Sequence, residues 1–228
     1  MVYTLKTNEP LTLVFATSSP RRKSFLARLG LDFVFIDPVG DERTRDYKEP
    51  IIEYVESLAL QKAMSVCDQV PSNSCVFGFD TIVSFQDEVI GKPIDKLDAL
   101  GTLKKLSGNQ HSVITAISVY DVTNGHHIEN SVITSVHLRN FHCEDIRRYV
   151  ETGDPMDKAG SYAIQNDIFN PVEKIDGCYF SVVGLPVCAL SEILTQMELD
   201  PIIYRALEVF DFDKCKKCLM LSSRENLR

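Results

Sequence analysis

A turn rich in hydroxyl and guanidinium groups, residues 17–22 (TSSPRR), is the segment of the sequence best suited to hold an anion. Ser19 is a good helix N-cap, and Pro20 suits the first position of the helix that the following apolar spacing predicts. The backbone N–H groups and positive dipole end of that helix, together with Arg21 and Arg22, would favour an anion there. A capped surface helix with two solvated arginines is the alternative that this segment alone leaves open.

Asp80 is the acidic residue whose setting most requires a chemical explanation. It follows Phe77, Gly78 and Phe79 in an otherwise apolar predicted strand. A carboxylate in such a setting is costly unless it is paired or binds a metal. Asp80 is therefore a candidate general base or metal ligand, and a structural cap of the turn after the strand is the alternative.

Two lysines could bring positive charge to the same site. Lys92 is held in a rigid turn between Gly91 and Pro93, and Lys62 lies on a predicted helix face that includes Leu58. Lys92 could equally be an ordinary exposed lysine. Lys62 either reaches into a site or runs along apolar surface towards solvent.

Further polar candidates lie in two segments. The loop at residues 37–48 contains the acidic pair Asp41 and Glu42, and the stretch 155–165 places Lys158 and Gln165 around a core of small residues. The Gln165 amide has both donor and acceptor atoms, enough to read the edge of a nucleobase. The alternative is a loop amide whose hydrogen bonds are satisfied locally.

The remaining motifs predict no second chemistry. His111 lies in a predicted strand and is expected to be a hydrogen-bonded structural residue, and no histidine pair has zinc-ligand spacing. Cys215 and Cys218 form a single CxxC, which is better explained as part of a surface tail than as a metal or redox site. The sequence has no Walker-type phosphate loop and no nucleophile elbow.

Composition bounds the class of protein and its partners. The chain has 228 residues, 44% hydrophobic and 25% charged, with a formal net charge of −8, which indicates a folded protein. The negative charge argues against a nucleic-acid or anionic-membrane surface and leaves room for a small basic pocket that takes a compact anion. Seven irregularly spaced cysteines predict no disulfide framework, and no signal peptide or membrane span is recognisable. We therefore expect a cytoplasmic protein without nucleic-acid or membrane partners.

Strands and helices alternate along the sequence, which predicts an α/β or mixed α+β fold. The pair Asn124 and Gly125 predicts a hairpin between strands at residues 113–122 and 131–138. Residues 154–184 are rich in polar side chains and are expected to form a functional loop. The other expected elements are strands at 11–16, 31–36, 75–79 and 82–85, and helices at 19–30 (closing at Gly30), 49–70, 97–106, 144–150 and from 186 onward.

Seven motifs, in order from about residue 13 to residue 194, together resemble the Maf proteins, which are house-cleaning nucleoside triphosphate pyrophosphatases. One such motif would be weak, whereas the ordered set is specific. The motifs are SSPRR (18–22), DT (80–81), GKP (91–93), LSG with HSVITA (106–108 and 111–116), DKAG (157–160), YAIQ (162–165) and VGLP (183–186).

The resemblance implies an elongated, two-lobed fold of the Maf and inosine-triphosphatase kind, with a mixed sheet and a central cleft. Residues 1–200 would form one catalytic domain, and residues 201–228 a C-terminal extension to which it assigns no role. The implied reaction is hydrolysis of a nucleoside triphosphate between the α- and β-phosphates with a divalent cation, Mg²⁺ or Mn²⁺. The resemblance also implies a homodimer. A non-catalytic nucleotide-sensing regulator of cell division is the alternative function.

The resemblance also assigns roles to residues of the matching motifs. Asp80 would accept a proton and bind the metal, and Glu42, or Asp41 beside it, would be the second carboxylate of the metal site. The residues that would hold the phosphates are Ser19, Arg21, Arg22, Lys62 and Lys92.

Base choice is the last property that the resemblance implies. Arg21, Thr81 and Gln165 match the subfamily that acts on dTTP, UTP and modified pyrimidine nucleotides. A sister subfamily, which acts on 7-methyl-GTP, has other residues in these places. The sequence departs from the usual family pattern beside these motifs at Phe79, Ala163 and Asn166.

Overall fold

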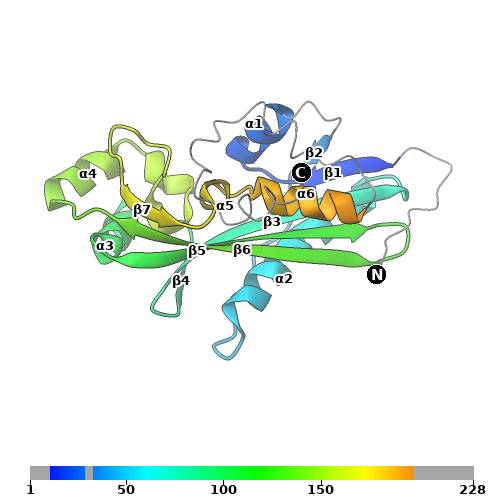
Figure 1. Ribbon diagram of the computed structural model, residues 1–228, viewed down its shortest axis with the longest axis horizontal. Helices are drawn as coiled ribbons and strands as arrows, with labels where there is room; N and C mark the ends of the chain where they lie inside the picture. The colour runs from blue at the N-terminus through cyan, green and yellow to red at the C-terminus, as the bar shows by residue number, and fades with distance from the viewer. Residues whose placement is uncertain (1–10, 29–32, 198–228) are drawn as a thin grey trace, which may run out of the picture.

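The computed structural model describes residues 11–28 and 33–197, and its strands form one seven-stranded mixed sheet (Figure 1). The strands are β1 (Thr12–Ala16), β2 (Val34–Ile36), β3 (Ser74–Phe85), β4 (Glu88–Ile90), β5 (Gln110–Asp121), β6 (His127–Leu138) and β7 (Val172–Asp176). Their order is β2-β1-β3-β5-β6-β7, with β4 also paired to β3. The β2-β1-β3 pairs are parallel and the other pairs are antiparallel. The predicted mixed α/β architecture is confirmed.

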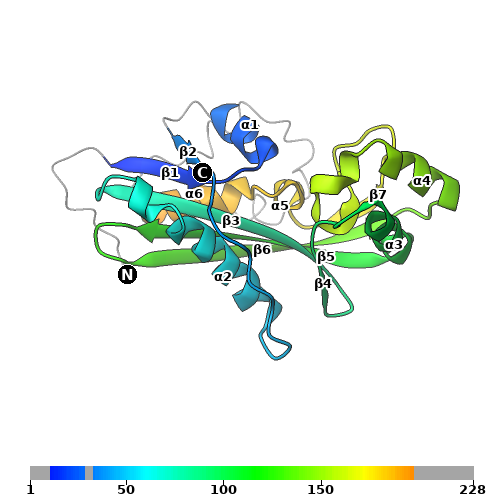
Figure 2. The same cartoon turned by 180° about the vertical axis from the view of Figure 1, so that it is seen from behind.

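Helices cover both faces of this sheet. They are α1 (Pro20–Arg28), α2 (Ile51–Met64), α3 (Lys96–Leu106), α4 (Cys143–Glu151), α5 (Tyr179–Val183) and α6 (Val187–Gln196). The α2 helix lies on one face, and α1, α5 and α6 lie on the opposite face (Figures 1 and 2). The α3 and α4 helices gather with β7 at one end of the elongated molecule.

Two main apolar clusters divide the molecule into two lobes. In one, Phe15 and Phe77 of the parallel strands pack with residues of α5 and α6. In the other, Val83, Val113 and Val136 pack with α3, α4 and the loop before β7. The long strands β3, β5 and β6 contribute to both clusters, so they join the lobes directly. The expected elongated, two-lobed form is confirmed.

The second helix is shorter than its apolar spacing predicts. It begins after Pro50, whose φ of −56° and ψ of 137° are not helical, and it ends at Met64 rather than at Val70. Val66 has φ of −116° and leads into a separate 3₁₀ turn at Cys67–Gln69. The prediction extended too far because Val66 is fully buried in the core although it lies outside the helix.

The segment at residues 154–184 is more ordered than the functional loop that was predicted. It contains β7, α5 and two 3₁₀ turns, Asp154–Asp157 and Ala159–Ser161. Each of these elements has five residues or fewer, too few for a periodic apolar pattern to identify. β7 is also an edge strand with the charged sequence VEKID, which further weakens its apolar signal.

Other strand boundaries also differ from the prediction. The runs predicted at residues 75–79 and 82–85 are one continuous strand, β3. β6 begins at His127 rather than at residue 131, because residues 127–130 pair with β5 although most of them are polar. Gly30, the start of the strand predicted at residues 31–36, and the extension 201–228 with its two cysteines lie outside the described residues. Within the described ranges, no helix is both long and apolar enough to cross a membrane.

Candidate functional site

A cavity of about 600 Å³ lies where one edge of β3 is left open. β1 ends opposite Gly78, and β4 pairs with β3 only from Val83, so neither strand covers residues 79–82. The cavity is also lined by the start of α1 and by residues 157–165. Ligands of open α/β sheets commonly bind beyond the carboxyl ends of parallel strands, which is where β1 places this cavity.

The residues that the sequence singled out as site candidates come together in this one cavity. They come from β3, from α1, α2 and four loops, so the fold brings together segments far apart in the sequence. The candidates that line the cavity are Ser19, Arg21, Arg22, Asp41, Glu42, Lys62, Asp80, Thr81, Lys92 and Gln165.

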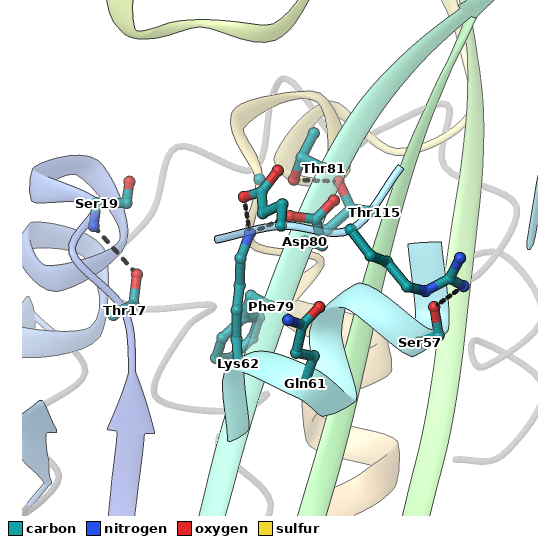
Figure 3. Close-up of polar contacts among 12 residues, drawn as sticks. Thr17, Ser19, Ser57, Gln61, Lys62, Phe79, Asp80, Thr81 and Thr115 are labelled. Atoms are coloured by element: carbon teal, nitrogen blue, oxygen red, sulfur yellow. Dashed lines mark hydrogen bonds and ion pairs between the residues drawn. The ribbon is translucent and has the colours of Figure 1, made fainter. Parts of the chain in front are cut away.

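The turn between β1 and α1 has the predicted geometry of a capped helix start. Ser19 Oγ accepts a hydrogen bond from the Arg22 backbone N–H at 3.4 Å. Thr17 Oγ1 accepts one from the Ser19 backbone N–H at 3.2 Å (Figure 3). These contacts fix the N-terminus of α1 at the cavity wall, where its free N–H groups and dipole favour an anion.

Lys62 joins two carboxylates in the cavity (Figure 3). Its Nζ donates to Asp80 Oδ1 and lies 2.7 Å from Glu42 Oε1. The Asp80 side chain is only 6% exposed, whereas that of Glu42 is 54% exposed. A buried carboxylate needs a partner, and Lys62 supplies it. Lys62 therefore reaches into the site, and Asp80 lies within a continuous strand instead of capping a turn.

Gly78 is what allows α2 to bring Lys62 this close to β3. A Cβ at Gly78 would overlap the Ala59 carbonyl oxygen and lie 2.7 Å from the Ala63 nitrogen. Only glycine permits this close approach of helix backbone and strand backbone. Because Gly78 and Asp80 share one face of β3, the same helix turn that rests on Gly78 presents Lys62 to Asp80.

The structure distinguishes Glu42 from Asp41. The Asp41 backbone carbonyl accepts a hydrogen bond from Gln61 Nε2 at 3.0 Å, which holds the loop against α2, while the Glu42 carboxylate reaches Lys62. Partial burial raises the pKa of Glu42, but Lys62, and more weakly Lys92, lower it further, so the net pKa is below its ordinary value. The second carboxylate beside Asp80 is thus Glu42, held in its charged form.

Arg22 is occupied by protein groups. Its Nε donates to Gly184 O at 2.7 Å, its Nη2 to Thr81 Oγ1 at 2.9 Å and its Nη1 to Phe79 O at 3.4 Å. Burial lowers the pKa of Arg22 to about 10, an effect that Asp80 opposes, so it stays charged at neutral pH. Arg22 ties the start of α1 to β3 and to the turn before α6, and a direct phosphate contact remains a prediction.

Two residues that depart from the family pattern serve packing and loop structure. The Phe79 ring is fully buried, lies 5.6 Å from the Phe15 ring centroid, and has the Arg22 guanidinium 5.5 Å from its own centroid. Asn166 Nδ2 donates to Asp154 Oδ2 at 3.0 Å, which closes the loop that carries Gln165. Phe79 thus supports Arg22 from the core side.

Thr81 faces away from Asp80, because successive residues of a strand point to opposite faces. Its hydroxyl accepts a hydrogen bond from Arg22 Nη2. It also lies 2.9 Å from Thr115 Oγ1 of β5 (Figure 3). The site therefore has a carboxylate half on the α2 side of β3 and a hydroxyl half on the α1 side. Thr115 was missed as an individual residue, although it belongs to the motif HSVITA and is a polar residue in an apolar run.

Arg21 carries a polar atom that the protein leaves unpaired. Its Nε is buried and has no hydrogen-bond partner within residues 11–28 and 33–197. Gln165 is exposed at the same cavity. Lys158, by contrast, is tied to Asp154 and Asp157, with its Nζ 3.0 Å and 2.5 Å from their carboxylates. Arg21 and Gln165 both line the cavity, so a ligand bound there could contact their side chains.

The carboxylate half fits a hard divalent cation. Mg²⁺ is usually held by one or two carboxylates together with substrate phosphates, rather than by a cage of protein ligands alone. No cluster of three or more His, Cys, Asp or Glu side chains suited to a metal occurs in the described part of the chain. Asp80 and Glu42 provide the two-carboxylate arrangement instead.

Comparison with known proteins matches residues 12–197 to the family of Maf-like proteins. A dTTP/UTP pyrophosphatase of Clostridium botulinum (strain Okra / Type B1) is 41% identical over 187 residues, covering 81% of this chain and 96% of that protein. A dTTP/UTP pyrophosphatase of Alkaliphilus metalliredigens is 43% identical over 182 residues, covering 80% and 94%. One from Dictyoglomus turgidum is 36% identical over 184 residues, covering 81% and 95%.

Among solved structures, a HAM1 protein from Coxiella burnetii aligns with a TM-score of 0.45 at 15% identity, covering 82% of this chain and all of that one. The family match spans most of the chain, and the sequence relatives align over nearly their whole length. Every motif that carried the resemblance lies within the matched residues, and each contributes at least one residue to the cavity or its supports. The chain belongs to the Maf family.

Proposed function

We propose that this protein is a nucleoside triphosphate pyrophosphatase that converts dTTP, UTP and modified pyrimidine nucleotides to the monophosphate and pyrophosphate, as a house-cleaning enzyme of the nucleotide pool. The names of its relatives support the substrate class. The observation that carries the proposal is the centre formed by Asp80, Lys62 and Glu42 in the cavity that also holds the anion-binding turn at residues 17–22.

The residues present divide the work of hydrolysis between them. A triphosphate repels an incoming nucleophile, so positive groups must offset its charge before water attacks the α-phosphorus. Arg21, Lys92 and the N-terminus of α1, capped by Ser19, would hold the phosphates, with Lys62 as a further cation. Asp80 would accept the proton of the attacking water, the bond from that oxygen to the α-phosphorus would form, and the bond to the β-phosphate oxygen would break. Pyrophosphate is then the leaving group.

We infer that Asp80 and Glu42 hold a divalent cation, Mg²⁺ or Mn²⁺, together with the substrate phosphates. Such a cation, when bound, offsets phosphate charge and lowers the pKa of coordinated water. Lys62 keeps the two carboxylates close together in the protein alone. Both carboxylates contact the single ammonium group of Lys62, which supports the inference that they can share one metal cation.

Base choice is assigned to Arg21, Thr81 and Gln165. The Arg21 guanidinium and the exposed amide of Gln165 support this assignment, because both side chains line the cavity and carry hydrogen-bond donors. The resemblance further implies a homodimer, which sedimentation of the purified chain would test.

A nucleotide panel with product analysis tests the function. UTP, dTTP, 5-methyl-UTP, CTP and 7-methyl-GTP are incubated with the protein and Mg²⁺ in H₂¹⁸O. We expect pyrophosphate from UTP and dTTP, with ¹⁸O in the nucleoside monophosphate. Release of orthophosphate would overturn the bond assignment, and a preference for 7-methyl-GTP would overturn the base assignment. Binding of nucleotide without turnover would point to the nucleotide-sensing alternative.

A further inference from the structure

We propose that Thr115, a residue outside the cavity, sets base selectivity by fixing the direction of the hydrogen on the Thr81 hydroxyl. Thr115 is fully buried and is not among the residues that line the cavity, whereas Thr81 lines it. The inference deepens the proposed function, because it rests on a nucleotide occupying that cavity. Thr115 is thus a positioning residue: it does not contact the nucleotide itself and acts through Thr81.

Three hydrogen bonds meet at the two hydroxyls (Figure 3 shows the pair). Arg22 Nη2 donates to Thr81 Oγ1 at 2.9 Å. Thr81 Oγ1 and Thr115 Oγ1 are 2.9 Å apart, and geometry alone allows either to be the donor. Thr115 Oγ1 in turn lies 2.7 Å from the Ser181 carbonyl oxygen. The chain therefore runs from α1 through β3 and β5 to α5.

The number of available hydrogens fixes the direction of this chain. A hydroxyl has one hydrogen and two lone pairs, and a carbonyl oxygen can only accept. Thr115 therefore donates its hydrogen to Ser181, and the hydrogen between the two threonines must belong to Thr81. Arg22 has no acceptor, so it fills one lone pair of Thr81. The Thr81 hydroxyl is left with one lone pair and no free hydrogen.

The opposite direction is unfavourable in this environment. If Thr115 donated to Thr81, its oxygen would face the Ser181 carbonyl oxygen at 2.7 Å without a hydrogen between them. Both residues are fully buried, so no solvent could relieve that contact. Two oxygen atoms 2.7 Å apart with no hydrogen between them repel each other, which keeps the Thr115 hydrogen on the Ser181 carbonyl and the Thr81 hydrogen on the Thr115 side.

A hydroxyl that can only accept distinguishes pyrimidines by their ring N–H group. Uracil and thymine carry a hydrogen on N3, whereas N3 of cytosine is an acceptor and would face the Thr81 lone pair. The space in front of the hydroxyl depends on Gly184, where a Cβ would lie 3.2 Å from both Thr81 Oγ1 and Arg22 Nη2. A site built to bind one hydrogen-bonding group rejects an analogue that lacks it. We therefore expect Thr81 to accept the N3–H of a bound uracil or thymine.

The test compares binding of α,β-imido analogues of UTP and CTP, so it is independent of turnover. Thr115→Val keeps the side-chain volume, releases the Thr81 hydrogen, and leaves the Ser181 carbonyl paired with the Gly184 N–H at 2.9 Å. We expect the wild type to prefer the uracil analogue and Thr115→Val to reduce that preference by about tenfold, mainly through tighter cytosine binding. Thr115→Ser retains the hydroxyl and should retain the wild-type ratio.

Thr134→Val is the matched control. Thr134 is also fully buried in the sheet and hydrogen-bonded to the Cys178 backbone, at 3.0 Å and 3.2 Å, but it does not line the cavity. It should lose stability without a change in the uracil-to-cytosine ratio.

The proposal is overturned if folded Thr115→Val keeps the wild-type ratio, if Thr134→Val changes the ratio as much, or if neither analogue binds. The wild type provides a second test that needs no variant. An N3-methylated UTP analogue cannot donate from N3, and it should bind at least about tenfold more weakly than the UTP analogue. Equal binding of the two would contradict the proposal. Pyrophosphate release in the nucleotide panel decides the enzymatic function separately.

Discussion

Lys62 takes part in two ion pairs at once, so its removal affects both carboxylates of the site. Asp80 would be left buried without its ion-pair partner, and Glu42 would lose the contact that lowers its pKa most strongly. A buried charge that loses its partner is strongly destabilising, while the half-exposed Glu42 remains screened by water. The same lysine is a proposed phosphate ligand, so its loss should affect activity as well as stability.

We predict that Lys62→Met lowers the free energy of unfolding in the absence of metal by roughly 1–3 kcal/mol. Methionine keeps most of the apolar stem and removes the charge. Mg²⁺ should stabilise the variant more than the wild type, because the cation replaces the missing charge between the carboxylates. Denaturant unfolding with and without Mg²⁺ measures both effects.

Lys96→Met is the control for this comparison. Lys96 pairs with Glu151 at 2.7 Å, but both side chains are more than half exposed, and the pair does not line the cavity. We expect a change within about 0.5 kcal/mol. A Lys62→Met variant that is as stable as the wild type and indifferent to Mg²⁺ would contradict the shared-cation assignment.

The sequence alone identifies those site residues whose chemistry conflicts with their surroundings. Asp80 was identifiable because a carboxylate in an apolar strand needs a partner, and its partner Lys62 was one of two lysines considered. The choice between Asp41 and Glu42 could not be made, because it depends on how the loop meets Gln61. Thr115 was missed because a buried threonine in a strand is unremarkable until its neighbours are known.

The contact between α2 and β3 at Gly78 is the packing feature that sets the carboxylate half of the site. No other residue fits at position 78, because a Cβ there would overlap backbone atoms of α2, which cannot move aside as a side chain would. The position of Lys62 relative to Asp80 is therefore determined by how closely α2 packs against β3, as well as by the two side chains.

We predict that Gly78→Ala lowers the free energy of unfolding by about 2 kcal/mol or more and reduces turnover, because α2 must shift away from β3. Gly101→Ala is the matched control, since Gly101 is an exposed residue of α3 with nothing within 4 Å of an added Cβ. That variant should gain roughly 0.5–1 kcal/mol from helix propensity. Full activity and stability in Gly78→Ala would show that this close approach does not position Lys62.

His111 of β5 supports the loop that carries Gln165. Its Nε2 lies 2.7 Å from the Tyr162 hydroxyl, and both side chains are buried. Burial lowers the pKa of His111 to about 4 from its ordinary 6.5, with a smaller effect of His137 in the same direction. The prediction of a hydrogen-bonded structural histidine is confirmed.

This pKa predicts a pH dependence of stability. As pH falls from 6.5 towards 4, the unfolded chain takes up a proton at His111 and the folded chain does not, so stability is lost over that range. The loss should reach at most about 3 kcal/mol. His111→Gln should flatten the curve of unfolding free energy against pH in this window, measured in urea. His126→Gln, at an exposed hairpin position, should leave the curve unchanged, and an identical slope in all three proteins would refute the assignment.

At the scale of elements, long periodic segments were predictable and short ones were not. The helix at residues 97–106 and the Asn124–Gly125 hairpin follow from local pattern. The strand β7 and the helix α5 depend on pairing and packing with segments far away in the sequence, so no local signal marks them. The open edge of β3 could not be predicted from the sequence either, because it results from where β1 and β4 end along β3.

For the whole molecule, the two lobes and the charge distribution define what can reach the site. The long strands β3, β5 and β6 join the two apolar clusters, and the cavity is lined by residues of both lobes. The chain carries a net charge of −8, while Arg21, Arg22, Lys62 and Lys92 bring positive charge to a cavity that also holds the carboxylates of Asp80 and Glu42. This combination suits a compact anion rather than a polymer.

That residues 1–200 are one catalytic domain and residues 201–228 an extension stays a prediction.

The central claim is that this cavity hydrolyses nucleoside triphosphates with Asp80 as the proton acceptor. Asp121→Asn is a matched control, because Asp121 is also buried but accepts hydrogen bonds from Thr123 and Asn124 at the hairpin, away from the cavity. The most direct measurement is the rate of pyrophosphate release from UTP, with Mg²⁺, by the wild type, Asp80→Asn and Asp121→Asn. We expect Asp80→Asn to lose about 10²-fold or more in kcat while remaining folded, and Asp121→Asn to retain activity. A folded Asp80→Asn that releases pyrophosphate at the wild-type rate would contradict the account.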